Sequence, residues 1–336
     1  MTIVYVGNRL AKKGFTATGV DLLGPRLAEN MNVVLVSDKV SKLHRLAEMM
    51  GTVLFERRLT TVLIDTYSGM GSWYALVCSF VARLRGARVV LSLHGGKLPE
   101  RVKRYPRYFG FLFKRAHRLV VPSGYLGAVV KQMGFEATEI ANGIHTAEFP
   151  FTPRRRCEGR LLFVRSLRRI YRPEMAIRLV AELKHRGKSA YLEIVGPDPE
   201  HRLHELTELA RSLGVAELIA FKGLLSQREW VGLSMDCDVM INTSSMDNQP
   251  FTLLEAMALG LPVVTTDVGG IPYLVQHEGN GLMVGSDVQQ LADQVMRLMD
   301  HPELVMQLSH AGKAFADQRD WSRIVASWRA ALAPDD

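Results

Sequence analysis

Short apolar runs alternate with amphipathic segments along the chain. In the first 150 residues, runs rich in Val, Ile and Leu predict six strands, at residues 2–6, 32–36, 61–65, 88–92, 118–121 and 137–140. Segments with the helical spacing of apolar residues predict helices at 18–30, 72–86, 100–115 and 123–133. Because strands that are buried on both faces read as continuous apolar runs, we expect a parallel sheet with helices on both sides.

The second half of the chain repeats this plan after a polar, proline-bearing link at 150–159. Its apolar runs predict strands at 160–164, 190–195, 218–221, 238–242, 262–266 and 281–284. The last segment, 321–332, is amphipathic. The sequence therefore predicts an α/β protein with Rossmann-like domains over 1–150 and 151–316, followed by a terminal helical segment over 317–336.

Composition is that of a soluble globular protein, with 47% hydrophobic and 23% charged residues among 336. No apolar run reaches the length needed to span a bilayer, and residues 1–7 enter a strand without the basic region and cleavage site of a signal peptide. Cys78, Cys157 and Cys237 are scattered and fit no metal-binding spacing. We therefore expect a cytoplasmic protein with reduced cysteines.

Positive charge is concentrated in the first half. Residues 1–150 hold 21 Lys and Arg against 10 Asp and Glu, whereas the remainder holds 21 against 24. Within this half, residues 97–118 carry eight basic residues, one acid and five aromatics. Such a mixture suits an anionic membrane interface or single-stranded nucleic acid. A packed helix with a solvated basic edge is the structural alternative.

Residues 247–275 carry the densest set of candidate functional residues. Asp247 and Glu255 lie eight residues apart around the start of a predicted helix at 253–259, and a buried strand follows at 262–266. A Gly269-Gly270 turn then leads into a second predicted helix, which has a proline in its first turn. Two helix N-termini would open at the carboxyl edge of a sheet, where open α/β folds bind anionic ligands.

Some short motifs of the chain also occur in proteins for purely structural reasons. Thr252 and Glu255 have the spacing of a capping box, in which the carboxylate only accepts a backbone hydrogen bond. The Asp-Cys-Asp sequence at 236–238 has the form of a metal-binding pair, but it directly precedes a strand. The Gly-Met-Gly sequence at 69–71 lacks the third glycine and the acidic residue of a dinucleotide fingerprint. We therefore expect neither a bound metal nor NAD.

The candidate motifs resemble, in their order and spacing, those of the family 4 glycosyltransferases. The resemblance is carried by Thr18-Gly19, His94-Gly95-Gly96, Asn142-Gly143-Ile144, the loop at 165–174, Gly196-Pro197 and the segment 247–275. It implies the GT-B fold, in which two Rossmann-like domains face each other across a cleft and a C-terminal helix crosses back to the first domain.

The resemblance also implies roles for three catalytic candidates. Glu255 would accept hydrogen bonds from the ribose hydroxyls of a nucleotide sugar, and Asp247 would contact hydroxyls of the donor sugar. His94 would lie near the reacting sugar carbon, although a histidine at a strand end can equally be a structural residue. Asp247 stands where the family more often has Glu.

A second set of residues is expected to bind the nucleotide-sugar donor, most of them through its phosphates. These donor-binding candidates are Gly19, Arg165, Arg172, Gly196, Pro250, Phe251 and Thr252. In the family an Arg and a Lys grip the diphosphate, but Ser166 and Tyr171 occupy those two positions here. We expect Arg165 or Arg172 to take over, because guanidinium groups bind phosphate bidentately. A solvated basic loop is the structural alternative.

The activity implied is retaining transfer of a sugar from a UDP- or GDP-type nucleotide sugar to an acceptor hydroxyl, without metal or other cofactor. The acceptor would be a bacterial glycan or lipid-linked glycan, and residues 97–118 would dock the protein on the inner face of the cell membrane. No nucleic-acid-binding module is visible, so nucleic acid is not an expected partner. A non-catalytic membrane-associated subunit and a nucleotide-sugar 2-epimerase remain alternatives.

Overall fold

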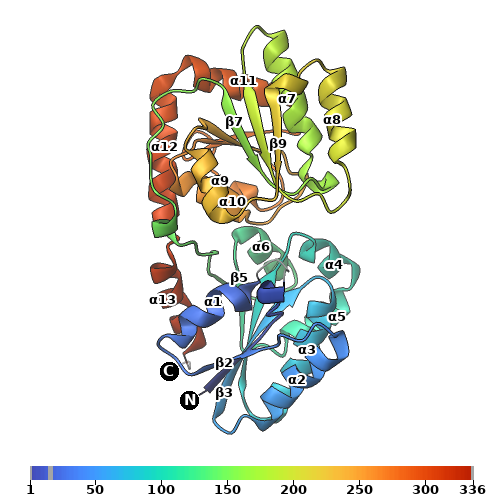
Figure 1. Ribbon diagram of the computed structural model, residues 1–336. Coiled ribbons are helices and arrows are strands. Elements are labelled where there is room, and N and C mark those ends of the chain that lie inside the picture. The colour runs from blue at the N-terminus through green and yellow to red at the C-terminus, as the bar shows by residue number, and fades with distance from the viewer. Residues whose placement is uncertain (1, 14–17, 334–336) are drawn as a thin grey trace. The chain divides into compact units, whose positions relative to one another are not determined.

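The computed structural model describes residues 2–13 and 18–333 and contains two compact α/β units (Figure 1). Unit 1 is formed by Met1–Asn142 together with Ser322–Asp336, and unit 2 by Gly143–Trp321. Each unit has one six-stranded sheet in which every strand pair is parallel. The fold is that of GT-B proteins, as expected.

Unit 1 has the strand order β2-β1-β3-β4-β5-β6. Its strands are β1 (Thr2–Val6), β2 (Val33–Val36), β3 (Leu59–Tyr67), β4 (Arg88–His94), β5 (Arg118–Val121) and β6 (Thr138–Glu139). Its helices are α1 (Gly19–Ala28), α2 (Lys42–Phe55), α3 (Met70–Leu84), α4 (Leu98–Arg104), α5 (Pro106–Phe113), α6 (Gly124–Gln132) and, from the end of the chain, α13 (Trp321–Leu332). One short 3-10 turn covers Ala11–Lys13.

Unit 2 has the strand order β12-β11-β10-β7-β8-β9. Its strands are β7 (Arg160–Val164), β8 (Tyr191–Val195), β9 (Ile219–Gly223), β10 (Val239–Asn242), β11 (Val263–Thr266) and β12 (Leu282–Val284). Its helices are α7 (Pro173–His185), α8 (Leu203–Ser212), α9 (Gln227–Ser234), α10 (Phe251–Ala258), α11 (Val288–Asp300) and α12 (Pro302–Asp317). Short 3-10 turns cover Thr146–Glu148, Arg169–Tyr171, Ala216–Leu218 and Ile271–Tyr273.

Burial on both faces of a strand explains why the strands were predictable. In β7, Leu161 and Phe163 pack into one apolar cluster of unit 2, and Leu162 and Val164 pack into the other. All four side chains are buried, so the strand shows no polar face. Every predicted strand is confirmed, with its ends shifted by one or two residues in most cases.

The helix predictions need two corrections in unit 1. Helix α2 was not predicted, because four of its large apolar side chains face solvent and blur its amphipathic pattern: Leu43, Met50, Leu54 and Phe55. The single helix expected over 100–115 is two helices, α4 and α5. They separate at Tyr105, whose φ of −130° and ψ of 57° are not helical. Pro106 follows it, and the residue before a proline disfavours the helical region.

The prediction of a helix after Gly269-Gly270 was wrong. Only one 3-10 turn forms there, at Ile271–Tyr273, and the chain then enters further turns. The Asn280 side chain holds these turns, because its Oδ1 accepts from the Gln276 amide at 2.7 Å and its Nδ2 donates to the Leu274 carbonyl at 3.1 Å. The carboxyl edge of this sheet therefore has one α-helix N-terminus in segment 247–275, that of α10.

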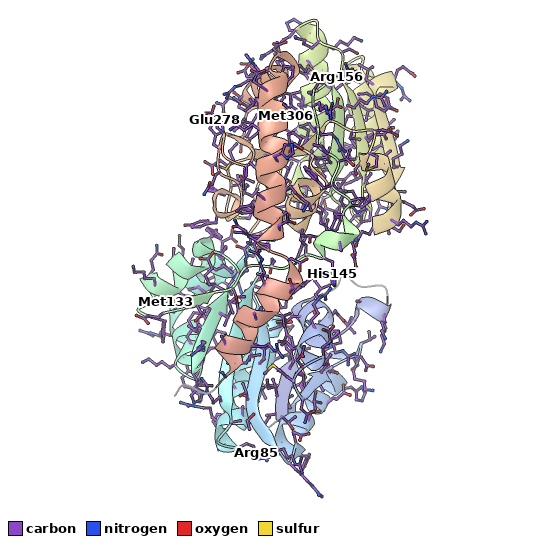
Figure 2. All side chains as sticks on the ribbon, turned by 90° about the vertical axis from the view of Figure 1, so that its left-hand side faces the viewer. Arg85, Met133, His145, Arg156, Glu278 and Met306 are labelled. Atoms are coloured by element: carbon purple, nitrogen blue, oxygen red, sulfur yellow. The ribbon has the colours of Figure 1, made fainter. Side chains whose placement is uncertain are left out.

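The compact units divide the chain at 142/143 and 321/322, whereas the sequence suggested 150/151 and 316/317. Residues 143–149 belong with unit 2 because Ile144 and Phe149 pack into one of its two apolar clusters. Ile144 also exchanges backbone hydrogen bonds with Arg319 and Trp321. The neighbouring His145 is exposed (Figure 2).

The aromatic segment 97–118 divides into buried and exposed parts. Phe109 and Phe113 are buried in the core of unit 1, so they are not available to a membrane or other partner. Tyr105 and Phe111 are exposed. Among the helices that the structure describes, none is both long and apolar enough to cross a membrane.

Candidate functional site

An arginine and a carboxylate form an ion pair at the carboxyl edge of the unit 2 sheet. Arg165 directly follows β7, and Asp247 lies in the loop between β10 and α10. The guanidinium Nη2 contacts Asp247 Oδ2, and each side chain is only 16% exposed. The guanidinium also lies over the Tyr171 ring, with Cζ 4.4 Å from the ring centroid. Arg165 and Asp247 are 82 positions apart in the sequence, and both were predicted to lie in a donor site. In the structure they contact each other.

The ion pair leaves hydrogen-bonding capacity unused. Arg165 Nε and Ser166 Oγ are buried and have no hydrogen-bond partner among residues 2–13 and 18–333. Burial lowers the pKa of Arg165, while Tyr171 and Glu255 oppose that effect. A guanidinium carries five N–H donors, and an unpaired buried donor costs free energy. At least one guanidinium donor of Arg165 and the Ser166 hydroxyl are thus unsatisfied within residues 2–13 and 18–333.

Glu255 lies on α10, one turn into the helix. Pro250 is the N-cap and no side chain caps this helix, so the capping-box alternative for Thr252 and Glu255 was wrong. Thr252 is the second helical residue, because the helix begins at Phe251, two residues earlier than a Thr252 cap would require. The first N–H groups of a helix have no partner within it, so Phe251 and Thr252 present N–H groups at this end.

Burial raises the pKa of Glu255 to about 7, with nearby Arg165 opposing the rise and Glu148 adding to it. The Glu255 carboxyl group therefore changes between its protonated and its ionised form near neutral pH. In the ionised form it accepts hydrogen bonds only, which suits a diol such as ribose.

Two glycines allow the loop that carries Asp247 to pack closely. A Cβ on Gly269 would lie 2.1 Å from the Asp247 carbonyl oxygen, and one on Gly270 would lie 2.1 Å from that of Asn248. The Gly270 amide donates to the Asp247 carbonyl at 2.9 Å. The Gly-Gly pair therefore positions Asp247, whereas the sequence suggested that it opens a phosphate-binding helix.

Gly196 makes a similar close approach to Arg165. Its φ is +150°, and a Cβ there would lie 2.1 Å from the Arg165 carbonyl oxygen. The Arg165 amide donates to the Val195 carbonyl at 2.9 Å. Gly196, predicted to line the donor pocket, is thus adjacent to the arginine predicted to bind the phosphates.

Arg172 is occupied within the protein. Its Nε donates to the Thr243 carbonyl at 2.8 Å, and its Nη2 to the Ser244 carbonyl at 3.1 Å and to Ser286 Oγ at 3.2 Å. These bonds tie the loop after β7 to the end of β10. Of the two arginines proposed for the diphosphate, Arg165 is the one with a buried donor, Nε, that has no partner among residues 2–13 and 18–333.

In unit 1, His94 and Gly19 both meet a buried carboxylate that the sequence analysis missed. Asp65 Oδ1 lies 3.0 Å from His94 Nε2, and its Oδ2 accepts from the Val20 amide at 3.0 Å. A Cβ on Gly19 would lie 2.8 Å from Asp65 Oδ1, so this glycine makes room for the carboxylate. The available signal was an acid inside an apolar strand, Val62-Leu63-Ile64-Asp65, since a buried charge needs partners.

Comparison with known families shows to which family this chain belongs. The family model for glycosyl transferases group 1 matches residues 147–315, which include the whole Arg165, Asp247 and Glu255 cluster. This is half of the chain. The chain belongs to the glycosyl transferases group 1 family.

The curated relatives of this group 1 chain align with about half of its length. The D-inositol 3-phosphate glycosyltransferase of Corynebacterium aurimucosum is 30% identical over 171 residues, covering 48% of this chain and 39% of that protein. A GDP-mannose-dependent alpha-(1-6)-phosphatidylinositol monomannoside mannosyltransferase of Mycobacterium tuberculosis is 31% identical over 155 residues, covering 44% and 38%. The chain thus matches well under half the length of each relative.

A solved structure extends the likeness in fold to the full chain. Anabaena Alr3699/HepE, crystallised with UDP, superposes with a TM-score of 0.78 over 99% of both chains at 18% identity. At this identity the likeness establishes the GT-B fold of the group 1 chain and no more.

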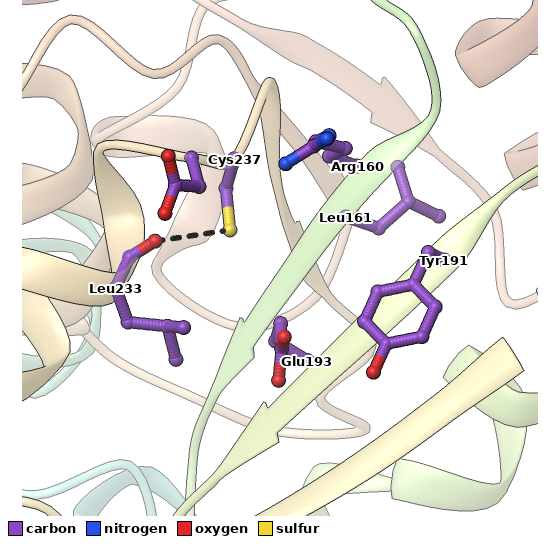
Figure 3. Close-up of a pocket in the computed structure, with 7 residues that line it drawn as sticks. Arg160, Leu161, Tyr191, Glu193, Leu233 and Cys237 are labelled. Carbon is purple, nitrogen blue, oxygen red and sulfur yellow. Dashed lines mark hydrogen bonds between the residues drawn. The ribbon is translucent and has the colours of Figure 1, made fainter.

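A separate cavity in unit 2 has none of Arg165, Asp247 and Glu255 in its lining (Figure 3). It has a volume of about 310 Å³ and is lined in part by Arg160 and Tyr191, the first residues of β7 and β8. It therefore opens at the amino ends of the strands, opposite the edge where parallel sheets bind ligands. Burial raises the pKa of its Cys237 thiol to about 12. Residues 2–13 and 18–333 contain no cluster of three or more His, Cys, Asp and Glu placed to hold a metal.

Replacement of Glu255 by Gln should stabilise the protein at high pH. The folded-state pKa, about 7, is above the 4.5 of the free side chain, so folding favours the protonated form. Stability is then lost as pH rises from about 4.5 to 7, by up to about 3 kcal/mol. The thermal midpoint of Glu255→Gln should match the wild type at pH 4.5 and exceed it at pH 8. An equal difference at both pH values would contradict the assignment. Glu217→Gln, an exposed site, is the control.

Proposed function

We propose that the chain is a retaining glycosyltransferase that moves a sugar from a UDP- or GDP-type nucleotide sugar to an acceptor hydroxyl. The observation that carries the proposal is the buried Arg165 with unused donors, held by Asp247 beside Glu255 at the sheet edge. Family membership supports the reaction class, and the curated relatives are named for glycosyl transfer.

Each member of the cluster has a chemical role in this proposal. Arg165 and the N–H groups of Phe251 and Thr252 bind the diphosphate, which suits a guanidinium and a helix N-terminus. Glu255 accepts hydrogen bonds from the ribose hydroxyls, and Asp247 contacts hydroxyls of the donor sugar. Unit 1, with His94, binds the acceptor.

The reaction then needs no metal and no covalent intermediate. The acceptor oxygen forms its bond to the sugar C1 on the face from which the diphosphate departs. The C1–O bond to the diphosphate breaks, its electron pair remains on the phosphate oxygen, and that oxygen takes the acceptor proton. Arg165 stabilises the negative charge that develops on the leaving group, as a preorganised cation does in a site sheltered from water.

The acceptor is proposed to be lipid-linked, because unit 1 has an exposed basic and apolar patch. The patch comprises Phe80, Arg83, Leu84, Phe111, Lys114 and Arg115 and surrounds a hollow of about 330 Å³. Arg115 Cζ lies 3.9 Å from the Phe111 ring centroid and 5.5 Å from that of Phe80. Exposed aromatics beside cations favour the interface of an anionic membrane, which supports the proposed docking on the inner face of the cell membrane.

A panel of nucleotide sugars should stabilise the protein selectively. At a hundred times its dissociation constant, the donor should add about 2.7 kcal/mol to the free energy of unfolding. We expect one nucleotide of a UDP-, GDP-, ADP-, CMP- and dTDP-sugar series to raise the thermal midpoint of the wild type at pH 8. Glu255→Gln should shift less, because the amide presents one acceptor oxygen to the ribose where the carboxylate presents two.

The matched control for this panel is Glu217→Gln, which makes the same change at an exposed site in unit 2. It should respond as the wild type does. A folded wild type that none of the nucleotide sugars stabilises would overturn the proposal and favour a non-catalytic subunit. Conversion of a UDP-sugar without any acceptor would favour a 2-epimerase.

Vesicle binding should depend on the patch. Each basic side chain near an anionic surface contributes about 1 kcal/mol, so Lys114→Gln with Arg115→Gln should weaken binding to phosphatidylglycerol vesicles roughly 30-fold. Sedimentation with vesicles of phosphatidylglycerol and of phosphatidylcholine measures this.

Two exposed arginines of unit 2 provide the control pair, Arg155→Gln with Arg156→Gln (Arg156 is labelled in Figure 2). They remove the same charge and should leave vesicle binding unchanged. Equal weakening by both pairs would indicate a net-charge effect and remove the patch from the proposal. Binding to neutral vesicles as strong as to anionic ones would do the same.

A further inference from the structure

Asp65 is a buried carboxylate that contacts His94, a predicted catalytic residue. Its side chain is 1% exposed and lies in β3, in register with Ser92 of β4. Beyond its contacts with His94 and the Val20 amide, its Oδ1 accepts from the Tyr5 hydroxyl at 2.9 Å. An ionised carboxylate buried this deeply is retained only where donors satisfy its oxygens.

The chain around Asp65 is built to bring these donors together. A Cβ on Gly7 would lie 2.8 Å from Asp65 Oδ2, and a Cβ on Gly19 would lie 2.8 Å from Oδ1. Any larger residue at either glycine would displace the carboxylate. Gly7, directly after β1, and Gly19, the first residue of α1, therefore leave room for the acid.

His94 is held at one nitrogen of its ring and is partly exposed. Its Nε2 faces both Asp65 Oδ1 and Ser92 Oγ, the latter at 2.9 Å. The ring stacks on Tyr67, with centroids 5.0 Å apart and planes inclined by 22°. The side chain is 17% exposed. Since the Nε2 edge is taken, the Nδ1 edge is the one left for a ligand.

We propose that Asp65 is a positioning residue that holds neutral His94 as the Nε2–H tautomer, so that the Nδ1 lone pair accepts a hydrogen bond from the acceptor hydroxyl. The carboxylate cannot donate, so it selects the tautomer with hydrogen on Nε2. In the bound state the hydroxyl donates its one hydrogen to Nδ1, which fixes the direction of its oxygen lone pair. As the C1–O bond to the diphosphate breaks, this hydrogen bond is exchanged for one to the leaving phosphate oxygen, which takes the proton. This role rests on the proposed glycosyl transfer.

The tautomer can be measured without any activity. Long-range proton–nitrogen NMR spectra of protein labelled with ¹⁵N-histidine distinguish the two neutral tautomers, and comparison with His94→Ala assigns the His94 signals. At pH 8 the wild type should show Nε2–H. Asp65→Asn should shift His94 toward Nδ1–H, because the amide can donate to Nε2. A wild-type ring in the Nδ1–H form would overturn the proposal even if the protein is a transferase.

A comparison of single and double variants tests the functional part. Asp65→Asn should lower kcat for sugar transfer about 100-fold while the dissociation constant of the donor stays unchanged. If Asp65 acts through His94, Asp65→Asn with His94→Ala should be no slower than His94→Ala alone. Additive losses would show that Asp65 has only a structural role.

Tyr5→Phe is the matched control, because it removes a different hydrogen bond to the same carboxylate. It should lower the thermal midpoint but keep the His94 tautomer and the transfer rate. If Asp65→Asn does not fold, Tyr5→Phe still tests the proposal. A change in the His94 tautomer or a 100-fold slower transfer rate in Tyr5→Phe would contradict it. Failure of every variant and of the wild type to transfer sugar, with Nε2–H retained, would refute only the proposed function.

Discussion

A buried cation at a sheet edge constrains much of unit 2. Removing the Arg165 guanidinium from water is costly, and the ion pair with Asp247 offsets only part of that cost because buried pairs gain little net stability. The surrounding chain holds both charges in place. Gly196 admits the backbone of Arg165, and Gly269 and Gly270 admit that of Asp247 and Asn248 respectively. Arg172 ties the arginine loop to the end of β10. Such an arrangement is better explained by ligand binding than by stability.

Both units use the same structural device at the carboxyl edges of their sheets. In unit 1, Gly7 and Gly19 leave room for the Asp65 carboxylate, and in unit 2 the Gly269-Gly270 pair leaves room for the backbone of Asp247. In each case a missing Cβ allows the chain to close around an acid that faces a second functional group. These glycines therefore act on the candidate sites indirectly, by positioning side chains.

The strands and the fold class could be predicted because parallel strands that are buried on both faces leave an uninterrupted apolar signal. Helix α2 could not, since the exposed Leu43, Leu54 and Phe55 hide its buried face. The turn at 271–273 resembled a helix start because proline suits a first turn, yet local Asn280 side-chain bonds to Gln276 and Leu274 hold the following residues in turns.

The types of the candidate-site residues could be recognised in the sequence, but the partners that these residues contact could not be predicted. The sequence singled out Arg165, Asp247 and Glu255, but not that Asp247 pairs with Arg165 or that burial moves the pKa of Glu255 to about 7. It treated Arg165 and Arg172 alike, and only the carbonyl partners of Arg172 distinguish them. Asp65 was missed because its three donors come from distant parts of unit 1.

The role of Arg165 in diphosphate binding is the central claim, and calorimetric titration of UDP and of GDP tests it most directly. Arg165→Gln should weaken binding of the preferred nucleotide about 10- to 150-fold, as expected for loss of a hydrogen bond between charged groups. Arg169→Gln, in the same loop with a side chain 73% exposed, should bind as the wild type does. Wild-type affinity in Arg165→Gln, or equal weakening in both variants, would contradict the account.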